Sequence, residues 1–222
     1  GGCSWGQVEY GEHFGYGLEF VEKDEKVYVE WLEKAVNQNN PCAMYFWGNW
    51  LKNGKILIHP TEGVWGLGCD AKNVQACKKI NTLKQRDENK KFIILAPSLE
   101  NALDYFEALS TEQITQLDNL WPGHITVIHT AKNIISDHLK ALDKTIGIRV
   151  SAHLPITKLL NEFSGPMVST SANLSNQQTP NSRVDLYQIF QDEDVAIYNH
   201  NNGTAKKPST ILRLHNMEYL RE

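Results

Sequence analysis

The stretch "TIGIRVSAHLPITKLLNEFSGPMVST", residues 145–170, predicts a strand, a helix and a second strand in succession. Its two ends, 145–151 and 166–170, are short apolar runs typical of buried strands, whereas 154–163 is typical of a helix. The same alternation continues on both sides of this stretch. Further strands are predicted at 55–60, 90–97, 124–130, 194–199 and 208–214, and further helices at 73–84, 99–109, 111–121 and 184–190. Strands that alternate with helices predict an α/β fold, layered around a twisted sheet.

The composition limits the class of protein. With 222 residues, of which 41% are hydrophobic, the chain is long enough for one large domain, or for one domain with an appendage. Its formal net charge of −4 gives no overall basic signature of nucleic-acid binding, although a local basic groove is still allowed. No apolar run approaches the roughly 20 residues that span a bilayer. Four cysteines without a C-x-x-C pair predict free thiols in a cytoplasmic protein.

The organisation of the chain changes near residue 43. Residues 1–20 are rich in glycine and aromatic residues, and 22–40 have the apolar spacing of a helix that ends in "NQNNP". A new pattern begins at Met44, which we expect to be the natural start. The predicted division is therefore an appended segment over residues 1–43 and a domain over residues 44–222.

Three cations occupy positions that could bind an anion, although each position also has a structural explanation. Lys84 and Arg86 follow a predicted helix two residues apart, so in an extended exit segment they would face the same side. Such a pair suits a carboxylate or phosphates, and a solvated charged loop is the alternative. Arg149 lies late in an apolar strand, where a charge needs either a buried ion-pair partner or an anionic ligand.

Small hydrogen-bonding side chains follow the strand at 166–170. Ser169, Ser171 and Asn173 occupy alternate positions, so in an extended segment all three point to one side. The glycine-rich stretch "TEGVWGLGCD", 61–70, predicts a turn that permits close approach of the backbone, or simply a packed turn. For the Trp-Pro-Gly sequence at 121–123 a structural turn with a packed tryptophan is favoured.

The polar residues together favour binding of anions. The histidines form no metal-binding pattern, and the chain has no G-x-S-x-G nucleophile elbow. What remains is a set of cations and small hydroxyl or amide groups: Lys84, Arg86, Arg149, Thr61, Ser169, Ser171, Asn173 and Ser209. Such a set suits catalysis by positioning and by charge stabilisation of phosphates, a carboxylate or bicarbonate.

Several motifs occur in the order of one known family. The succession H-P-T-E-G-V-W-G-L-G-C-D, L-K-Q-R, W-P-G-H-I-T, I-R-V, S-T-S-A-N-L-S and P-S-T-I-L resembles the YrdC-like family, the threonylcarbamoyl-AMP synthases, over about residues 44–222. The resemblance implies a twisted mixed sheet flanked by helices, with an open concave substrate cleft. It implies synthesis of threonylcarbamoyl-AMP from L-threonine, bicarbonate and ATP, with magnesium accompanying the ATP and pyrophosphate released. A downstream complex then transfers the threonylcarbamoyl group to adenosine 37 of tRNA.

The resemblance also implies roles for particular residues. The family's K-x-R and S-x-N set is matched by Lys84, Arg86, Ser171 and Asn173, which are the expected catalytic residues. Threonine is expected at Thr61, Ser169 and Arg149. The nucleotide is expected at Arg86, Lys90, Ser171, Asn173 and Ser209. No protein side chain is expected to bind a metal, no membrane is expected as a partner, and a tRNA contact is left open.

Some positions depart from the family pattern and two other functions stay open. The departures are His59 for Tyr, Gly63 for Thr or Ala, Trp65 for Tyr or Phe, Asp87 for Pro, Ser151 for Pro and Asn176 for Gly. The first alternative is an RNA-binding module of the same fold that makes no adenylate. The second is a carbamoyl-transfer domain of the hydrogenase-maturation type, although the chain lacks the zinc-finger cysteines found beside such domains.

Overall fold

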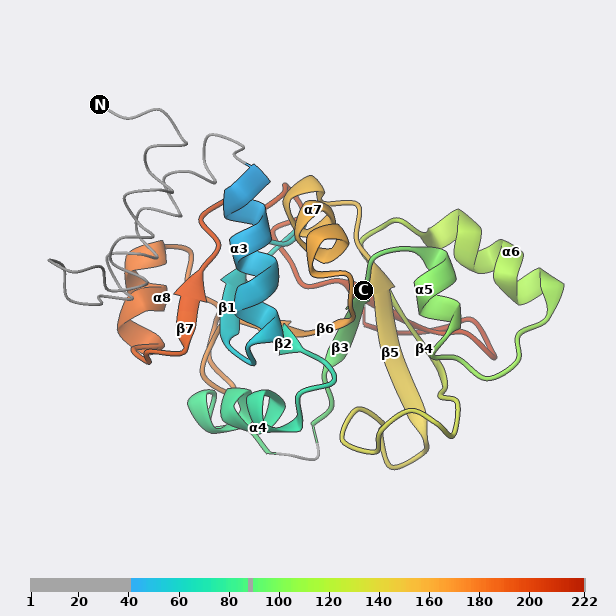
Figure 1. The fold of residues 1–222 in the computed structure, drawn as a ribbon. Helices are drawn as coiled ribbons and strands as arrows, with labels where there is room; N and C mark the ends of the chain where they lie inside the picture. The colour runs from blue at the N-terminus through green and yellow to red at the C-terminus, as the bar shows by residue number, and fades with distance from the viewer. Residues whose placement is uncertain (1–40, 88–89, 222) are drawn as a thin grey trace, which may run out of the picture.

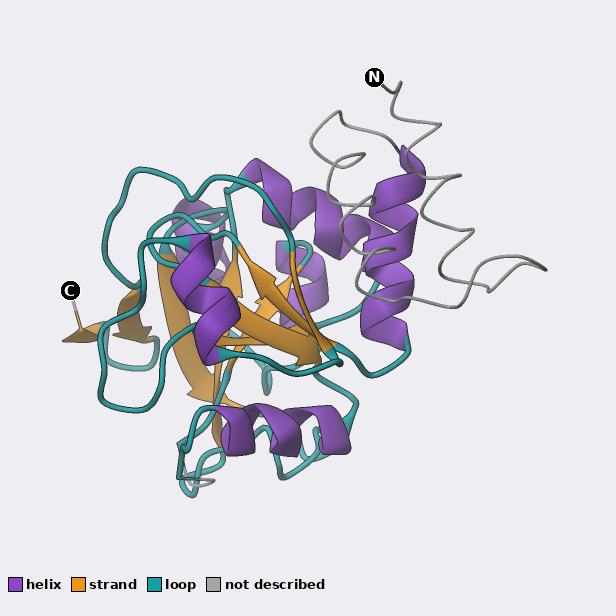
Figure 2. Ribbon diagram, turned by 90° about the vertical axis from the view of Figure 1, so that its left-hand side faces the viewer, coloured by secondary structure: helices purple, strands orange, loops and turns teal. Residues whose placement is uncertain are grey.

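The computed structural model describes residues 41–87 and 90–221. The helix predicted at 22–40, and almost all of the predicted appendage, lie outside the described residues. The described part forms a mixed sheet that is enclosed by helices (Figures 1 and 2). The predicted α/β class, a twisted mixed sheet flanked by helices, is therefore confirmed.

The sheet has nine strands within the described residues, in the order β7-β1-β2-β6-β3-β5-β4-β8-β9. Pairings β7–β1, β3–β5 and β4–β8 are parallel, and the other neighbouring pairs are antiparallel. The strands are β1 (Ile56–His59), β2 (Gly66–Asp70), β3 (Ile93–Ala96), β4 (Ile125–Thr130), β5 (Thr145–Val150), β6 (Met167–Ser171), β7 (Val195–Ile197), β8 (Thr210–Arg213) and β9 (Glu218–Arg221). Strands far apart in the sequence thus become neighbours, above all β6 between β2 and β3.

The helices pack on both faces of the sheet. They are α3 (Pro41–Lys52), α4 (Val74–Leu83), α5 (Leu99–Leu103), α6 (Thr111–Leu120), α7 (Leu154–Phe163) and α8 (Arg183–Ile189). Helices α3 and α7 lie side by side over one face (Figure 1). Local signals explain the helix starts: Asn73, Ser98, Ser110 and Ser182 each accept a hydrogen bond from a backbone N–H of the first turn.

Alternation along the strands divides the buried apolar residues into two cores. On β1, Leu57 packs with α3 and α7, whereas Ile56 and Ile58 pack in the core on the opposite side with α4 and α8. On β6, Met167 belongs to the first core and Val168 to the second. Successive side chains of a strand point to opposite faces, so a short apolar strand supplies both cores at once.

Several predicted elements need correction. The glycine-rich stretch at 61–70 is not one turn, because its second half forms β2. Glycines interrupt the alternation of apolar and polar side chains that would indicate a strand. Strand β2 nevertheless pairs with both β1 and β6 in the centre of the sheet. Strand β9 was not predicted, and α5 ends at Leu103 rather than near residue 109. Helix α3 begins at Pro41, so a boundary at residue 43 falls inside a helix.

Two structural predictions are confirmed. Trp121 is buried, stacks on Phe106 with ring centroids 6.4 Å apart, and donates its Nε1–H to the carbonyl of Ile125 at 2.8 Å. Its turn is therefore structural. Cys69 and Cys77 are free thiols, with their sulfur atoms 3.8 Å apart. Cys3 and the side chain of Cys42 lie outside the described part.

Candidate functional site

A cavity of about 250 Å³ brings together residues from distant parts of the sequence. Its walls come from the loop after β1 and from β2, β3, β5, β6, β8 and β9. Six of the predicted site residues line it: Thr61, Arg86, Arg149, Ser169, Ser171 and Ser209. The other lining residues are Val64, Trp65, Gly66, Lys91, Ile93, Thr170, Pro208, Ile211 and Arg221. The structure thus assembles most of the predicted set around one space.

Lys84 does not line this cavity, but it contacts Ser171, which does. It caps the end of α4 and is buried, with 3% of its surface exposed. Its ammonium donates hydrogen bonds to the carbonyls of Ser171 and Asn173, and to Asn173 Oδ1 at 3.4 Å. Burial, with a smaller contribution from the charge of Arg86, lowers the pKa of Lys84 to about 7. Lys84 therefore ties the end of α4 to the end of β6.

The predicted extended exit segment is wrong. Lys84 has helical backbone angles, and Gln85 has a φ of +49°, in the left-handed region. The reversal at Gln85, rather than strand alternation, separates the two cations. Lys84 bonds to the backbone at the end of β6, whereas Arg86 enters the cavity wall.

Arg86 is held from three sides. Its NH1 donates to Thr170 Oγ1 at 3.1 Å, its NH2 donates to the carbonyl of Lys91 at 2.6 Å, and its guanidinium lies 4.9 Å from the ring centre of Phe92. Burial lowers its pKa, although an arginine stays charged at any physiological pH. These contacts orient the cation and exclude the alternative of a freely solvated loop.

The polar row of β6 is partly as predicted. Ser169 and Ser171 lie on the same face of the strand, and Asn173 follows beyond its end. Ser171 Oγ donates to Asn173 Oδ1, and Asn173 Nδ2 donates to the carbonyls of Leu174 at 2.7 Å and Gln177 at 2.6 Å. Asn173 is 8% exposed and does not line the cavity. Within the structure it holds Ser171 and the following turn.

Arg149 has one of the two partners that the sequence left open, an ion-pair carboxylate, and it also lies beside a space that could hold the other. It is 5% exposed, its NH2 lies 3.4 Å from Glu62 Oε2, and it also lines the cavity. Its Nε has no hydrogen-bond partner in the described residues. A guanidinium with an unused buried donor beside a cavity is suited to an anionic or carbonyl ligand.

Glu62 was missed by the sequence analysis. It accepts hydrogen bonds from Ser151 Oγ at 2.7 Å and from the backbone N–H of Ala152 at 3.1 Å. Burial raises its pKa, but Arg149 and the bond from Ser151 outweigh burial, so the net pKa lies below its ordinary value. Ser151, which stands where the family usually has Pro, thus supports the partner of Arg149. The acidic residue of the H-P-T-E motif was the signal that could have identified Glu62.

The far wall of the cavity contains a second missed residue, Arg221 of β9. Its guanidinium donates to the carbonyl of Ser209 at 2.6 and 2.9 Å. Ser209 Oγ is 2.8 Å from Thr126 Oγ1. Arg221 ends a strand of only four residues, Glu218–Arg221, all of them exposed, so no alternation of buried and exposed positions marks this strand in the sequence.

Lys90 lies apart from the cavity walls. It is exposed, and its Nζ lies 3.5 Å from Asn176 Oδ1. The neighbouring Lys91 lines the cavity instead. A contact of Lys90 with a nucleotide stays a prediction.

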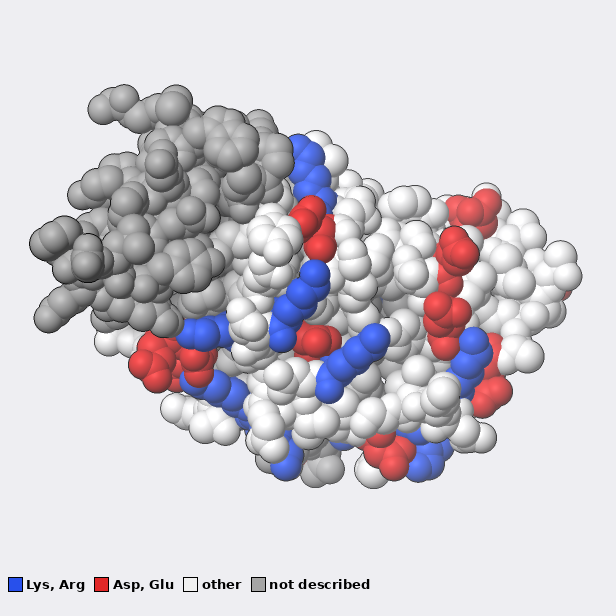
Figure 3. Space-filling model, in the orientation of Figure 1, with Lys and Arg blue, Asp and Glu red and all other residues white. Residues whose placement is uncertain are grey.

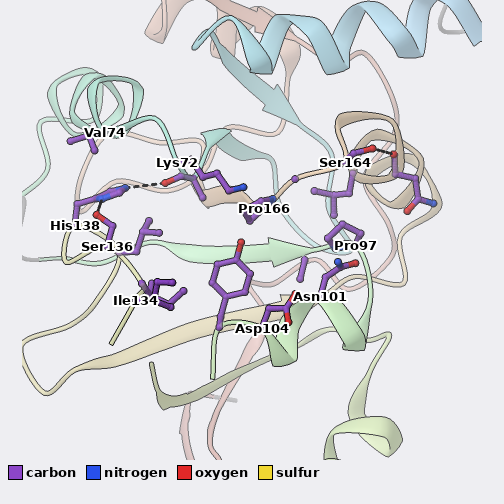
Figure 4. Close-up of a pocket in the computed structure, with 18 residues that line it drawn as sticks. Lys72, Val74, Pro97, Asn101, Asp104, Ile134, Ser136, His138, Ser164 and Pro166 are labelled. Atoms are coloured by element: carbon purple, nitrogen blue, oxygen red, sulfur yellow. Dashed lines mark hydrogen bonds between the residues drawn. The ribbon is translucent and has the colours of Figure 1, made fainter. Parts of the chain in front are cut away.

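A larger cavity, of about 710 Å³, lies elsewhere in the molecule (Figure 4). It is bounded by α5, the loop after β4 and the end of α7. His138 donates from Nε2 to the carbonyl of Ala71 at 2.9 Å, and its Nδ1 accepts from Ser136 Oγ at 2.7 Å. None of the predicted site residues line this space. Size alone would favour this cavity as the functional site, but the cations that gather around the smaller cavity favour the smaller one instead.

Neither a cluster of metal-binding side chains nor a membrane-spanning helix is found among the described residues. They contain no group of three or more His, Cys, Asp or Glu side chains arranged to hold a metal ion. Within the same part of the chain, no helix is both long and apolar enough to cross a bilayer. On the face viewed in Figure 3, basic and acidic side chains are interspersed, without a broad area of either sign.

The fold and the site define an α/β domain whose sheet carries a cavity lined by arginines and hydroxyl groups, a class suited to anionic substrates. The chain belongs to the Sua5/YciO/YrdC family, whose model, described as "Telomere recombination", matches residues 49–222. This confirms the resemblance inferred from the motifs.

Individual proteins agree with this assignment. The chain is 35% identical over 174 residues to a threonylcarbamoyl-AMP synthase of Vibrio campbellii, covering 78% of this chain and 94% of that protein. E. coli YciO superposes with a TM-score of 0.73 at 22% identity, covering 82% of this chain and 90% of that one. P. abyssi Sua5, in a structure complexed with L-threonine, superposes with a TM-score of 0.70 at 24% identity. That match covers 79% of this chain and about half, 52%, of Sua5.

Proposed function

We propose that this chain synthesises threonylcarbamoyl-AMP from L-threonine, bicarbonate and ATP, and releases pyrophosphate. The observation that carries the proposal is the set of curated relatives named threonylcarbamoyl-AMP synthase, at 33–35% identity over most of the chain. The assembly of Arg86, Arg149 and Arg221 around one cavity supports it, because ATP and a carbamate bring several negative charges together. The names of these relatives also favour the synthase over an RNA-binding module without adenylate chemistry.

The reaction requires two bond-forming steps. The threonine amine attacks the carbon of bicarbonate, and a carbamate forms with loss of water. A carbamate oxygen then attacks the α-phosphorus of ATP. The bond between the α-phosphorus and the oxygen that bridges it to the β-phosphorus breaks, and pyrophosphate leaves with the electron pair of that bond. Neither step needs a protein nucleophile. The protein would supply orientation and preorganised positive charge.

The proposed roles follow the positions of the residues. Arg86 and Arg149 would stabilise charge at the α-phosphate and the carbamate. The rest of the predicted catalytic set, Lys84, Ser171 and Asn173, would hold the end of β6 beside them. Thr61, Ser169 and Arg149 would contact threonine, and the nucleotide would extend toward Ser209, with Arg221 beside it. The support is that Arg86 and Arg149, each held by contacts within the protein, line the same cavity as the two serines of β6.

Magnesium would enter with ATP. Glu62, the carboxylate that pairs with Arg149, accepts from Ser151 and Ala152 at Oε1 and lies 3.4 Å from the Arg149 guanidinium at Oε2, so it is poorly placed to bind a metal. The residues present therefore fit a metal held mainly by phosphate oxygens, whose charge would help to neutralise the departing pyrophosphate.

The wider setting is also a proposal. The product would pass to a complex that transfers the threonylcarbamoyl group to tRNA, and the reaction would take place in the cytoplasm. A tRNA contact would need a basic surface other than the mixed face of Figure 3. Residues 1–40, the part of the predicted appendage that precedes helix α3, are proposed to be dispensable for the reaction.

The test is an assay of pyrophosphate release by the full chain. Release should require ATP, L-threonine and bicarbonate together, and mass spectrometry should detect threonylcarbamoyl-AMP. Equal release in reactions that lack threonine would refute the synthase proposal and leave an ATP-hydrolysing or RNA-binding protein of the same fold.

A further inference from the structure

His59 is a buried polar residue to which no role has been assigned. It is the last residue of β1 and has 0% of its surface exposed. Gly66 lies opposite it in β2, and a Cβ on Gly66 would lie 2.4 Å from Cε1 of the imidazole ring. The glycine therefore leaves room for the ring. Both ring nitrogens have partners: Nδ1 lies 3.1 Å from the carbonyl of Pro60, and Nε2 lies 3.2 Å from Ser169 Oγ.

These two contacts fix the positions of the protons. A carbonyl oxygen only accepts, so Nδ1 carries the proton that it donates to Pro60. Burial is the largest effect on the imidazole and lowers the pKa of His59 to about 4, so the ring is neutral near pH 7 and Nε2 is an acceptor. Ser169 must therefore donate its hydroxyl proton to Nε2. Its lone pairs are left for the cavity that Ser169 lines.

Two neighbouring hydroxyl groups are fixed in the same way. Thr61 Oγ1 donates to the carbonyl of Val64 at 2.6 Å and accepts from the N–H of Gly63 at 3.1 Å. Ser171 Oγ donates to Asn173 Oδ1. All three hydroxyl groups thus use their protons within the protein. Toward the cavity they are acceptors, while the donors come from the arginines.

We propose that His59 is a positioning residue that holds Ser169 as a hydrogen-bond acceptor, so that the cavity selects an amino acid presenting an amine or hydroxyl donor there. The proposal rests on the proposed function, because it concerns the recognition of threonine. It also explains why a polar ring is buried at a position where a core residue would otherwise be apolar. A histidine that only filled space would make no such contribution to substrate recognition.

The test is a double-mutant cycle on the full chain, with binding of L-threonine measured by calorimetry. His59→Leu frees the Ser169 hydroxyl to rotate, and Ser169→Ala removes it. Each single variant should weaken threonine binding about tenfold, as expected for one lost hydrogen bond. If His59 acts through Ser169, the double variant should bind no more weakly than Ser169→Ala alone. Additive losses would overturn the proposal.

Further measurements separate this role from a general effect on folding. His59→Gln, whose amide oxygen accepts a hydrogen bond near the Nε2 position, should restore part of the threonine affinity. In the pyrophosphate assay, His59→Leu should raise the KM for threonine and leave the KM for ATP nearly unchanged. His138→Leu, which removes a hydrogen-bonded histidine at the larger cavity, is the matched control and should change neither constant. A parallel rise of both KM values in His59→Leu would contradict the proposal.

Failure of this inference is distinguishable from failure of the proposed function. If the wild-type chain releases no pyrophosphate with threonine, the synthase proposal fails. Calorimetry still tests His59 in that case, because coupled losses would support its role in binding. Absence of threonine binding to the folded wild-type chain would overturn the inference itself.

Discussion

At the scale of single residues, the site depends on a few cations that contacts within the protein hold in place. Arg86 is the clearest example, because its guanidinium is held by a hydroxyl, a carbonyl and an aromatic ring before any ligand binds. Preorganisation of this kind avoids reorganisation when charge develops in the transition state. Its cost is that any change of Arg86 affects both the protein and the reaction.

Arg86→Ala should lower kcat/KM about a hundredfold, more than it weakens ATP binding, because a charge-assisted contact worth roughly 3 kcal/mol is lost in the transition state. Arg86→Lys should restore only part, since lysine lacks the planar fork that contacts Thr170 and Lys91 together. Steady-state pyrophosphate kinetics measure both effects.

The control for this prediction is Arg183→Ala, which removes an exposed arginine at the start of α8. It should leave the kinetics unchanged. Circular dichroism must show that all variants are folded. If folded Arg86→Ala shows the kinetics of the wild type, the prediction is wrong and Arg86 has only a structural role.

His59 predicts a pH dependence of stability. Its pKa falls from 6.5 to about 4 on folding, with burial as the main cause, so between these values the unfolded chain binds a proton that the folded chain does not. Stability is therefore fully present above pH 6.5 and falls as the pH drops toward 4, by roughly 3 kcal/mol from this group. In His59→Gln this contribution should disappear. Urea unfolding at pH 7.5 and at pH 4.5 measures it, and equal losses in both proteins would contradict the assignment.

At the scale of elements, two loops beside the cavity lie in close contact, at Gly63 and at Lys207. Gly63 stands where the family usually carries a larger residue, and the reason lies in a distant segment. A Cβ at Gly63 would lie 1.9 Å from the carbonyl oxygen of Lys207, next to Pro208 and Ser209 of the cavity wall. Two loops more than a hundred residues apart thus constrain one another.

Gly63→Ala should destabilise the protein by about 1–3 kcal/mol, because the backbone near Lys207 must move to accept the methyl group. Denaturant unfolding measures the loss. The matched control is Gly48→Ala in α3, where the added Cβ would meet atoms of Glu162 at 3.4 Å. That change should be neutral or stabilising, since alanine is the better helix former. Equal stability of Gly63→Ala and wild type would show that the backbone near Lys207 can move without loss of stability, which would contradict this prediction.

At the scale of the whole molecule, α3 belongs to the domain although it lies mostly outside the family match, which begins at residue 49. Trp47 and Leu51 are 0% exposed and pack with α7 and the central strands. The boundary of the domain is therefore better placed before Pro41 than inside the helix.

Deletion of residues 1–40 should leave a folded chain with pyrophosphate-releasing activity, because the described residues beyond this segment already form both cores and the cavity. Deletion of residues 1–52 should abolish the thermal transition, since it removes Trp47 and Leu51 from the core. Differential scanning calorimetry distinguishes these outcomes. An insoluble or unfolded product of the shorter deletion would show that the segment before Pro41 contributes to the fold.

The sequence by itself determined the layered α/β class, most strands and helices, and the types of residue in the site. These depend on local patterns: apolar strands, helix caps and ordered motifs such as K-x-R and S-x-N. Strand β2 could not be predicted from the sequence, because its glycines give no alternation of apolar and polar side chains. Lys84 and Arg86 were assigned an extended segment, because a single left-handed residue, Gln85, has no strong local signal.

Only the tertiary structure decided which groups meet. The pairing of β2 with β6 places His59 against Ser169, and the addition of β9 places Arg221 against Ser209. Glu62 gains its role from Arg149 and Ser151, which lie far along the chain. The physical reason is that proton positions, ion pairs and burial depend on distances in space, whereas the local pattern of a sequence reports only the preferences of neighbouring residues.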